Sequence, residues 1–311
     1  MERIKISVVI PSYKTEEEVM TRTIESVLSQ SYKPHEVIVV DDNGGNEYSV
    51  MNRNLSLKYS DSVRFVFYEK NMGANYARNT GVRNATGEFI AFLDADDEWN
   101  KDYLEKNAEI INNKGAKFIS NGYYIVTKSG KFTFDRSHFK DGDVSRKIFF
   151  KDYGGPTSSI VVNRKTLIDS GLFDESLPAR QDYDMWIRCA QLVPFYYINE
   201  PMMNIYRDGH DSISSSYERN VRGTMMVLNK ILNTYNLSKD EIKNVKYAQY
   251  TRMAMSSAQG NNFVDSRKYM RKALCEKFTF KGGGLFVVYC FPGIYRYVRR
   301  LRHNNRENTS K

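Results

Sequence analysis

The sequence predicts an α/β fold, with a mostly parallel central sheet that carries helices on both faces and a small C-terminal helical region. Over the first hundred residues, short and wholly apolar runs alternate with segments whose apolar residues recur at helical spacing. Such runs are typical of parallel strands that are buried on both faces of a sheet. After residue 215 the strand signals end, and helical segments follow near residues 217–235, 239–258 and 262–276.

Four strands are predicted in the first hundred residues, at 6–10, 36–40, 63–68 and 88–93. After the first, Thr15 precedes three glutamates, which is a typical helix start, and apolar residues recur at helical spacing as far as Leu28. A second helix is predicted from Gly73 to Asn84. Further extended segments are expected at 118–126, 159–162 and 195–206, with helices at 163–170 and 182–192 between them.

The chain is expected to divide into three parts. Residues 1–215 carry all of the predicted strands, residues 216–280 form a helical appendage, and residues 281–311 form a basic, aromatic tail. The 311 residues are 41% hydrophobic and 27% charged. This is the composition of a globular protein that is large enough to bury a sizeable core.

Cysteine content and apolar runs bear on location. The three cysteines are scattered and form no C-x-x-C pair, which argues against a disulfide scaffold or a zinc–cysteine site and favours a reducing compartment. The apolar run at residues 6–10 is too short for a signal peptide, and the longest run, residues 285–294, contains Pro292 and Gly293. We therefore expect a cytoplasmic protein that is peripheral on the cytoplasmic face of the cell membrane.

The net charge of +9 is concentrated near the C-terminus. From Lys281 onward there are seven Lys or Arg residues and one acid, Glu307. Arginines interleaved with Phe and Tyr suit a segment that lies in an anionic bilayer interface. A nucleic-acid-binding tail and a solvated tail are the alternatives. Because no recognised nucleic-acid-binding motif accompanies the basic residues, we expect no nucleic-acid partner.

Acidic residues follow two of the predicted strands. Asp41 and Asp42 follow the second strand, and Asp94, Asp96 and Asp97 follow the fourth. Parallel α/β sheets bind ligands at the carboxyl ends of their strands, and carboxylate oxygens are preferred ligands of Mg²⁺ and Mn²⁺. Acidic turns also cap helices, so a D-x-D pattern alone does not identify a site. Its position after a buried strand is what favours one.

Several segments, in order along the chain, resemble the family 2 glycosyltransferases of the Rossmann-like GT-A fold, which build bacterial polysaccharides. They are VVIPSY (8–13), VVDD (39–42), NMGANYARNTG (71–81), TGEFIAFLDADD (86–97), GLFDESL (171–177), QDYDMW (181–186) and Tyr206-Arg207 with His210. The likeness covers residues 4 to 215. One such motif could arise by chance, but the ordered set is not expected by chance.

The resemblance implies roles for the first two strand ends. Residues that match Pro11, Tyr13 and Asp41 bind the nucleotide base in the family, and a carboxylate that accepts from the uracil N3–H would favour UDP. Arg78 matches an arginine near the nucleotide, where a guanidinium complements phosphate or base oxygens. The alternatives are packing for Tyr13, helix capping for Asp41 and a helix-surface salt bridge for Arg78.

The D-x-D segment implies a divalent cation, Mn²⁺ or Mg²⁺. Asp94, with Ala95, would contact the ribose or a metal-bound water, and Asp96 would bind the metal directly. His210 matches a position that can reach the metal or the diphosphate, although a lone histidine is more often structural. A cation at this place would neutralise the charge that the diphosphate leaving group gains.

The family's catalytic base falls on Asp182, at a predicted helix start. It would take the proton of the acceptor hydroxyl as that oxygen attacks, which inverts the anomeric centre; helix capping is the alternative. Gln181 stands where the family has Glu, and Asp184 is the reserve candidate. On the acceptor or sugar side, Arg180 is a candidate, and Trp186 either stacks on a sugar or is buried.

The resemblance therefore implies an inverting, metal-dependent, hexosyltransferase-type enzyme of cell-surface polysaccharide synthesis. Its partners would be a nucleotide-sugar donor, expected to be a UDP-sugar, a lipid-linked or oligosaccharide acceptor, and a membrane surface contacted through the tail. One alternative is the same fold with a GDP- or dTDP-sugar. Another is a non-catalytic scaffold that binds nucleotide sugars or membranes, which only Gln181 encourages.

Overall fold

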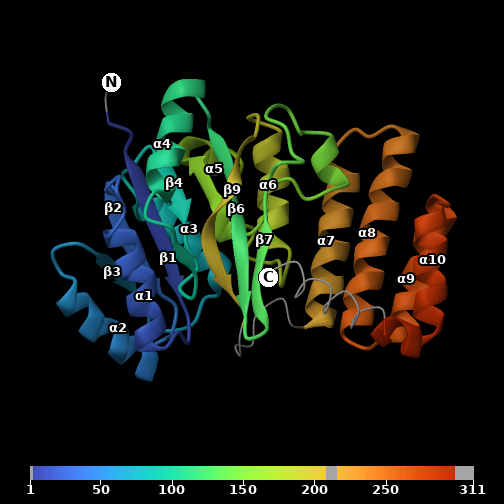
Figure 1. The fold of residues 1–311 in the computed structure, drawn as a ribbon, viewed down its shortest axis with the longest axis horizontal. Helices are drawn as coiled ribbons and strands as arrows, with labels where there is room; N and C mark the ends of the chain where they lie inside the picture. The colour runs from blue at the N-terminus through green and yellow to red at the C-terminus, as the bar shows by residue number, and fades with distance from the viewer. Residues whose placement is uncertain (1–2, 208–215, 298–311) are drawn as a thin grey trace. The chain divides into compact units, whose positions relative to one another are not determined.

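A computed structural model describes residues 3–207 and 216–297 of the chain, which divides into two compact units (Figure 1). The first unit comprises residues 1–145, 153–175 and 185–208. The second comprises residues 146–152, 176–184 and 209–311. The two short segments, 146–152 and 176–184, thus group with the C-terminal helices, which the sequence did not indicate.

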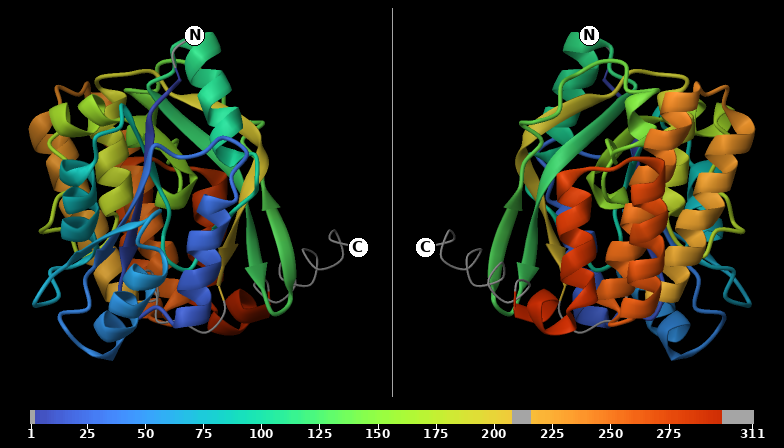
Figure 2. Two further views of the ribbon diagram at one scale, coloured as in Figure 1. Left: turned by 90° about the vertical axis from the view of Figure 1, so that its left-hand side faces the viewer. Right: turned by 90° about the vertical axis from the view of Figure 1, so that its right-hand side faces the viewer.

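The first unit is built on one mixed sheet with the strand order β3-β2-β1-β4-β8-β6-β9-β5, and β7 pairs with β6. The strands are β1 (Ile6–Ser12), β2 (Glu36–Asp41), β3 (Arg64–Phe67), β4 (Phe89–Phe92), β5 (Glu98–Trp99), β6 (Phe118–Thr127), β7 (Gly130–Phe134), β8 (Ile160–Asn163) and β9 (Tyr196–Tyr206). Strands β3, β2, β1 and β4 are parallel, which confirms the four strands predicted first. Beyond them β8 runs antiparallel to β4 and β6, and β6 pairs with β7 in a long ribbon beside β9 (Figure 2).

Helices cover both faces of this sheet. They are α1 (Glu17–Leu28), α2 (Glu47–Lys58), α3 (Ala74–Asn84), α4 (Tyr103–Lys114), α5 (Arg164–Asp169) and the later part of α6 (Gln181–Ala190), and α2 and α4 were not predicted. Apolar residues of α1, α2 and α4 form one core with Val8 and Ile10 of β1. Val9, which points to the opposite face, meets α3 at Gly81. A Cβ at Gly81 would lie 2.2 Å from a Val9 methyl carbon, so only glycine permits this close approach.

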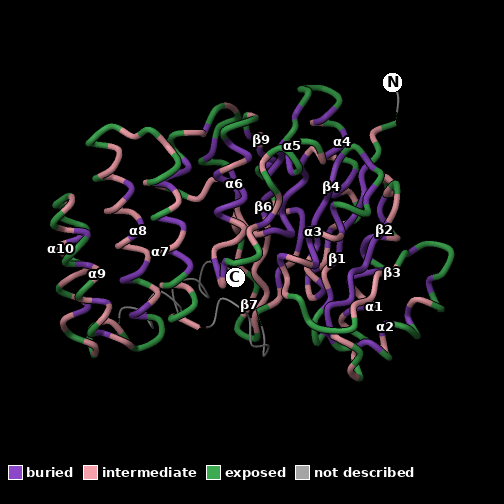
Figure 3. Tube along the Cα trace, turned by 180° about the vertical axis from the view of Figure 1, so that it is seen from behind, coloured by how far each residue is buried: buried purple, intermediate pink, exposed green. Residues whose placement is uncertain are grey.

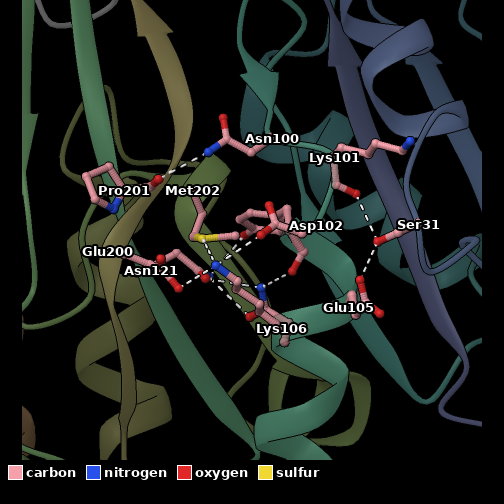
Figure 4. A network of polar contacts seen from close by, with 12 residues as sticks. Ser31, Asn100, Lys101, Asp102, Glu105, Lys106, Asn121, Glu200, Pro201 and Met202 are labelled. Atoms are coloured by element: carbon pink, nitrogen blue, oxygen red, sulfur yellow. Dashed lines mark hydrogen bonds and ion pairs between the residues drawn. The ribbon is translucent and has the colours of Figure 1, made fainter.

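A polar network joins α4 to β9 (Figure 4). The Lys106 ammonium lies 3.0 Å from the Asp102 carboxylate and 2.5 Å from that of Glu200. The hydrogen bond to Glu200 is the largest cause of a raised pKa for Lys106. The next residue, Asn107, exchanges side-chain amide hydrogen bonds of 3.1 Å with Asn121 of β6. These contacts fix β9, whose last residues lie near the acidic turn described below.

The second unit is helical. Its elements are the short 3₁₀ helix η1 (Lys147–Phe149), the first residues of α6, and α7 (Tyr217–Thr234), α8 (Lys239–Gln259), α9 (Phe263–Glu276) and α10 (Phe280–Cys290). From α7 to α10, each helix packs on the next. The segment before α6 packs against α7 so closely that a Cβ at Gly223 would lie 2.3 Å from the Ala179 carbonyl oxygen. The Tyr183 hydroxyl donates to the Ile148 carbonyl over 2.7 Å, which ties α6 to η1.

In the described part of the tail, α10 ends at Cys290, and after a break at Phe291 residues 292–297 are helical again, while residues 298–311 lie outside the described residues. None of the helices within the described ranges has the length and apolar character that crossing a membrane requires. All three cysteines are free thiols, with Cys189 buried and Cys275 exposed.

Candidate active site

The D-x-D residues form a turn directly after β4. The Asp97 backbone N–H donates to the Asp94 carbonyl over 3.0 Å, which closes the turn. Helix α1 holds the turn from one side, because the Thr23 hydroxyl lies 2.9 Å and 2.8 Å from the carbonyl oxygens of Ala95 and Asp97. Arg22 of the same helix donates to the Asp96 carbonyl over 2.9 Å. The backbone of the turn is therefore fixed, and its carboxylates are carried on a rigid support.

Arg78 of α3 pairs with the first carboxylate of the turn. Its Nη2 donates to Asp94 Oδ1 over 2.6 Å, with the Arg78 side chain 8% exposed and that of Asp94 33% exposed. Two further nitrogens, Arg78 Nε and Nη1, are buried and have no hydrogen-bond partner among the described residues. Because an unsatisfied buried donor is costly, this guanidinium is suited to an oxygen-rich ligand. The alternative of a helix-surface salt bridge does not hold, since Arg78 is buried.

Asp97, the last acidic residue of the turn, has a buried carboxyl group. Its Oδ2 accepts from the Ser158 hydroxyl over 2.6 Å, and the same hydroxyl oxygen accepts from the Asp94 backbone N–H over 3.0 Å. Burial raises the pKa of Asp97 well above its usual value, with Asp96 and Asp94 adding to the rise. Hydrogen bonds from Ser158 and from the backbone of Tyr206 act in the opposite direction. Asp97 thus links the turn to β9, and Ser158 is a residue that no sequence motif indicated.

Asp41, at the end of β2, is fully buried. Its carboxylate accepts from Asn52 Nδ2 over 2.7 Å and from the Ser49 hydroxyl over 2.5 Å, and it also accepts from the Asn43 side-chain amide. The cap of α2 is a different residue, Asn46, whose side chain accepts from the backbone N–H groups of the first turn. Helix capping, the alternative raised for Asp41, is therefore not its role, and base recognition by Asp41 remains a prediction.

Asp42 holds the loop that leads into α3. Its carboxylate accepts from the backbone N–H groups of Met72, over 2.6 Å, and Gly73, over 2.8 Å. The Asn71 side-chain amide donates to the same carboxylate over 3.0 Å. Burial raises the pKa of Asp42, while the two backbone hydrogen bonds oppose the rise. Asp42 thereby positions the start of the helix that carries Arg78.

Tyr13 and Pro11 lie at the end of β1, beside β2. Pro11 pairs in register with Val40, and Tyr13 follows the strand with 51% of its surface exposed. The Lys14 ammonium lies 5.4 Å from the centroid of the Tyr13 ring. Packing, the alternative raised for Tyr13, therefore does not account for this half-exposed ring.

Three predicted site residues, Arg180, Asp182 and Asp184, belong to the second unit, at the start of α6. The Asp182 carboxylate accepts from the Tyr183 backbone N–H over 2.7 Å. A carboxylate in the first turn of a helix is stabilised by the helix dipole. Asp184 is buried, and its carboxylate lies 2.6 Å from the ammonium of Lys230 on α7. The ion pair makes Asp184 a structural contact between α6 and α7 in this unit.

Arg180 has a left-handed backbone conformation, with φ of 65°. Its guanidinium lies over the Tyr183 ring, 4.7 Å from the centroid, and 3.7 Å from an Asp152 carboxylate oxygen. Burial lowers the pKa of Arg180 and Arg252 adds to this effect, while Asp182 and Asp152 oppose it. Arg180 thus supplies positive charge beside Asp182.

Trp186 is fully buried in the first unit. Its indole N–H donates to the Gly155 carbonyl over 2.9 Å, and its ring meets Phe118 edge-on at 5.2 Å between centroids. Of the two possibilities that the sequence left open, the structure therefore shows burial, and no ring face is presented for stacking on a sugar. His210 lies outside the described residues.

Within residues 3–207 and 216–297, no group of three or more His, Cys, Asp or Glu side chains is arranged to hold a metal ion. Mg²⁺ commonly binds through one or two protein carboxylates together with substrate phosphates. Asp94 and Asp96, on one turn, provide that donor set. The residues present therefore fit a cation that shares its coordination with a diphosphate.

The sequence model of the family described as "Glycosyl transferase family 2" matches residues 7–171, which is more than half of the chain. The chain belongs to this family. The match contains the turn from Asp94 to Asp97 and the helix that carries Arg78. The predicted membership of this family is thereby confirmed.

Two curated relatives of this family 2 glycosyltransferase have assigned roles. The amylovoran biosynthesis glycosyltransferase AmsB of Erwinia amylovora is 33% identical over 215 residues, which are 66% of this chain and 71% of AmsB. The Escherichia coli protein WfgD, named UDP-Glc:alpha-D-GlcNAc-diphosphoundecaprenol beta-1,3-glucosyltransferase, is 29% identical over 221 residues, 70% of this chain and 82% of WfgD.

Solved structures confirm the GT-A fold. Residues 1–349 of TarS from S. aureus, in complex with UDP-GlcNAc, match with a TM-score of 0.66 at 18% identity, over 98% of this chain and 90% of that one. The mannosyltransferase PcManGT from Pyrobaculum calidifontis, in complex with GDP-Man and Mn²⁺, matches with a TM-score of 0.62 at 15% identity, over 99% and 87%.

Proposed function

We propose that this glycosyltransferase moves a sugar from a UDP-linked donor to a hydroxyl of a lipid-linked glycan, with inversion at the anomeric carbon. The reaction would use Mn²⁺ or Mg²⁺ at the D-x-D turn and would serve cell-surface polysaccharide synthesis on the cytoplasmic face of the membrane. The observation that carries the proposal is the buried Arg78 guanidinium, which pairs with Asp94 and keeps two donor nitrogens, Nε and Nη1, without a protein partner among the described residues. The names of WfgD and AmsB support the lipid-linked acceptor and the polysaccharide product.

Arg78 would bind the donor diphosphate. Nη2 is held by Asp94, so the guanidinium plane is fixed before the donor arrives, and Nε and Nη1 can donate to phosphate oxygens. A divalent cation bound by Asp96 would neutralise the charge that the diphosphate gains as it leaves. Thr23 and Arg22 keep the turn in place during this change, because they hold its carbonyl oxygens.

Asp182 would act as the general base. The Tyr183 N–H holds its carboxylate. The acceptor hydroxyl gives its proton to this carboxylate while its oxygen bonds to the anomeric carbon, and the bond between that carbon and the diphosphate oxygen breaks. Attack from the face opposite the diphosphate inverts the anomeric centre. Gln181, the preceding residue, is uncharged where the family has Glu. Asp182 is therefore the one carboxylate that remains of this pair.

A GDP-sugar is the second candidate donor. The Asp41 carboxylate is fully buried and already accepts three side-chain hydrogen bonds, which leaves about one of its roughly four acceptor positions for a base. One acceptor position is enough for the uracil N3–H, which is why UDP is the first candidate. PcManGT, of the same fold, was solved with GDP-Man. Calorimetry of UDP, GDP and dTDP with Mn²⁺ distinguishes these donors, and we expect UDP to bind most tightly. Tighter binding of GDP or dTDP would overturn the UDP assignment.

Two substitutions test the division of roles. We expect Asp96→Ala and Asp182→Asn each to abolish sugar transfer, because the first removes the proposed metal ligand and the second removes the base. Only Asp182→Asn should leave metal-dependent UDP binding nearly unchanged in calorimetry. Equal loss of UDP binding in both variants would refute this division. Release of UDP from the donor by the unmodified protein, with metal and without acceptor, would exclude a non-catalytic scaffold.

A further inference from the structure

Helix α10 is apolar but is buried over only a small part of its surface. Its sequence, FKGGGLFVVYC, contains one charged residue, Lys281, and of its eleven residues only Gly282 and Tyr289 are buried. Figure 3 shows exposed and intermediate residues over most of this helix. A helix that is apolar on all sides is ordinarily enclosed by protein or by lipid. The described residues of the helical unit enclose one side of α10 alone.

The packed side of α10 faces α9 and α8. Leu285, Phe286, Val288 and Tyr289 join the small core that α8 and α9 form around Met270. These residues lie in the second half of α10, and near its start Gly282 is also buried, where an added Cβ would lie 3.1 Å from Leu274 and from Tyr247. The position of α10 is therefore set by protein packing, while its other side remains in contact with solvent.

Exposed aromatic and aliphatic residues are concentrated on α10 and on the residues that flank it in the sequence. Six of the fourteen exposed large apolar side chains among the described residues lie between positions 278 and 297. We call this set the apolar C-terminal surface: Phe278, Phe280, Val287, Phe291, Ile294 and Tyr297. Phe280 is 92% exposed and Phe278 is 70% exposed, and their rings lie 6.0 Å apart. Exposed apolar groups at this density mark an interaction site.

The charge around this surface is strongly positive. Between residues 267 and 281 the chain has six Lys or Arg residues and one acid, Glu276, which lies 3.3 Å from the Lys246 ammonium. From residue 282 to residue 297, where the described part of the chain ends, the sequence has one further basic residue, Arg296, and no acid. A second copy of this chain seated on the surface would bring the same positive charge against it, which is unfavourable. An anionic surface is complementary to it.

We propose that the apolar C-terminal surface is a docking site for an anionic lipid bilayer. The exposed Phe, Val and Ile side chains enter the boundary between headgroups and acyl chains, and Tyr297 lies at the level of the headgroups. Lys281 and Arg296, both exposed, bind lipid phosphates. This proposal rests on the proposed function only for the biological role of the docking site. A lipid-linked acceptor requires an enzyme that works at a membrane surface.

Flotation of the full chain with vesicles tests this proposal. The vesicles are phosphatidylcholine alone or phosphatidylcholine mixed with phosphatidylglycerol. We expect binding to the anionic vesicles, weakened by salt, and a loss of about a hundredfold in the triple variant Phe280→Ser, Val287→Ser, Phe291→Ser. Leu57→Ser is the matched control, because Leu57 is a 77% exposed leucine on α2 of the first unit. It should bind vesicles like the unmodified protein.

Charge reversal provides a second and independent variant. Lys281→Glu with Arg296→Glu keeps every apolar group and should weaken binding to the anionic vesicles by tenfold or more. Unchanged flotation of the triple variant, at a thermal midpoint equal to that of Leu57→Ser, would overturn the proposal. So would an unmodified protein that is dimeric in light scattering and becomes monomeric in the triple variant, because the surface would then join two copies.

Transfer to a water-soluble acceptor without vesicles separates this proposal from the proposed function. The triple variant should retain that activity, since none of its three residues belongs to the candidate active site. If the unmodified protein binds anionic vesicles but transfers no sugar, the proposed function fails and the docking site stands. If it transfers sugar but does not bind vesicles, the docking site is refuted and the proposed function is retained.

Discussion

Ser158 is the residue through which the structure makes its sharpest prediction about the D-x-D turn. Replacing it with alanine removes one hydroxyl and little volume. That hydroxyl donates to Asp97 over 2.6 Å and accepts from the Asp94 backbone N–H over 3.0 Å, in a part of the molecule where Ser158 and Asp97 are both buried. The substitution therefore leaves two polar groups without this partner. The backbone contacts of residue 158 are unaffected.

The magnitude follows from these two groups. A buried polar group that loses its partner costs about 1–3 kcal/mol, so the loss at two groups in Ser158→Ala should lower the free energy of unfolding by about 2–6 kcal/mol. Because Asp94 holds Arg78, part of this loss should appear in donor binding. We expect the dissociation constant for UDP with Mn²⁺ to rise about tenfold or more, which corresponds to about 1.4 kcal/mol.

Urea unfolding and calorimetry of UDP binding measure the two effects separately. Ser159→Ala is the matched control, because Ser159 is also fully buried and its hydroxyl donates to the Pro156 carbonyl over 2.8 Å, away from the turn. It should lose about 0.5–1.5 kcal/mol of stability and bind UDP normally. If Ser158→Ala loses stability but binds UDP as tightly as Ser159→Ala does, the hydroxyl has no part in positioning the turn.

Two further predictions concern reactivity and packing. Burial raises the pKa of the Cys189 thiol to about 12, so this residue has almost no thiolate near neutral pH, whereas Cys275 is exposed. In the folded protein at pH 8, iodoacetamide should therefore label Cys275, and Cys189 should react only after unfolding. Mass spectrometry of the peptides measures the labelling of each cysteine. Equal labelling of the two in the folded protein would contradict the buried position of Cys189. Gly81→Ala should cost about 1–3 kcal/mol of stability, because the new Cβ would meet Val9. The control Gly284→Ala, on α10, has open space and should be neutral or stabilising by about 0.5–1 kcal/mol in thermal unfolding.

The features that the sequence predicted well are those that depend on neighbouring residues. Strands β1, β2, β3 and β4 and helices α1 and α3 follow from apolar runs and helical spacing, and they were found within a few residues of the expected ends. Helix α2 was not predicted, because its buried positions include only one large apolar residue, Leu55, beside Ser49 and Asn52. The short strand β5 gave no signal either, since two residues carry no periodicity.

The candidate site divides in the same way. The acidic turn and Arg78 were visible because each belongs to a short local motif. Ser158 was not, because it lies 61 residues from the Asp97 that it contacts and stands in no motif. The sequence left both helix capping and base recognition open for Asp41, and only the folded structure shows that Asn46 takes the cap.

The amino-acid sequence by itself determined the order of strands and helices, the family, and the acidic, basic and aromatic residues available for chemistry. Tertiary structure alone decided which of these groups are buried, which atoms they contact and which side of α10 remains exposed. The physical reason is that helical and strand periodicity is set by residues a few positions apart. Burial and hydrogen bonding depend on segments that are distant in the chain, such as β4 and the residues before β8, and those contacts exist only once the sheet has formed.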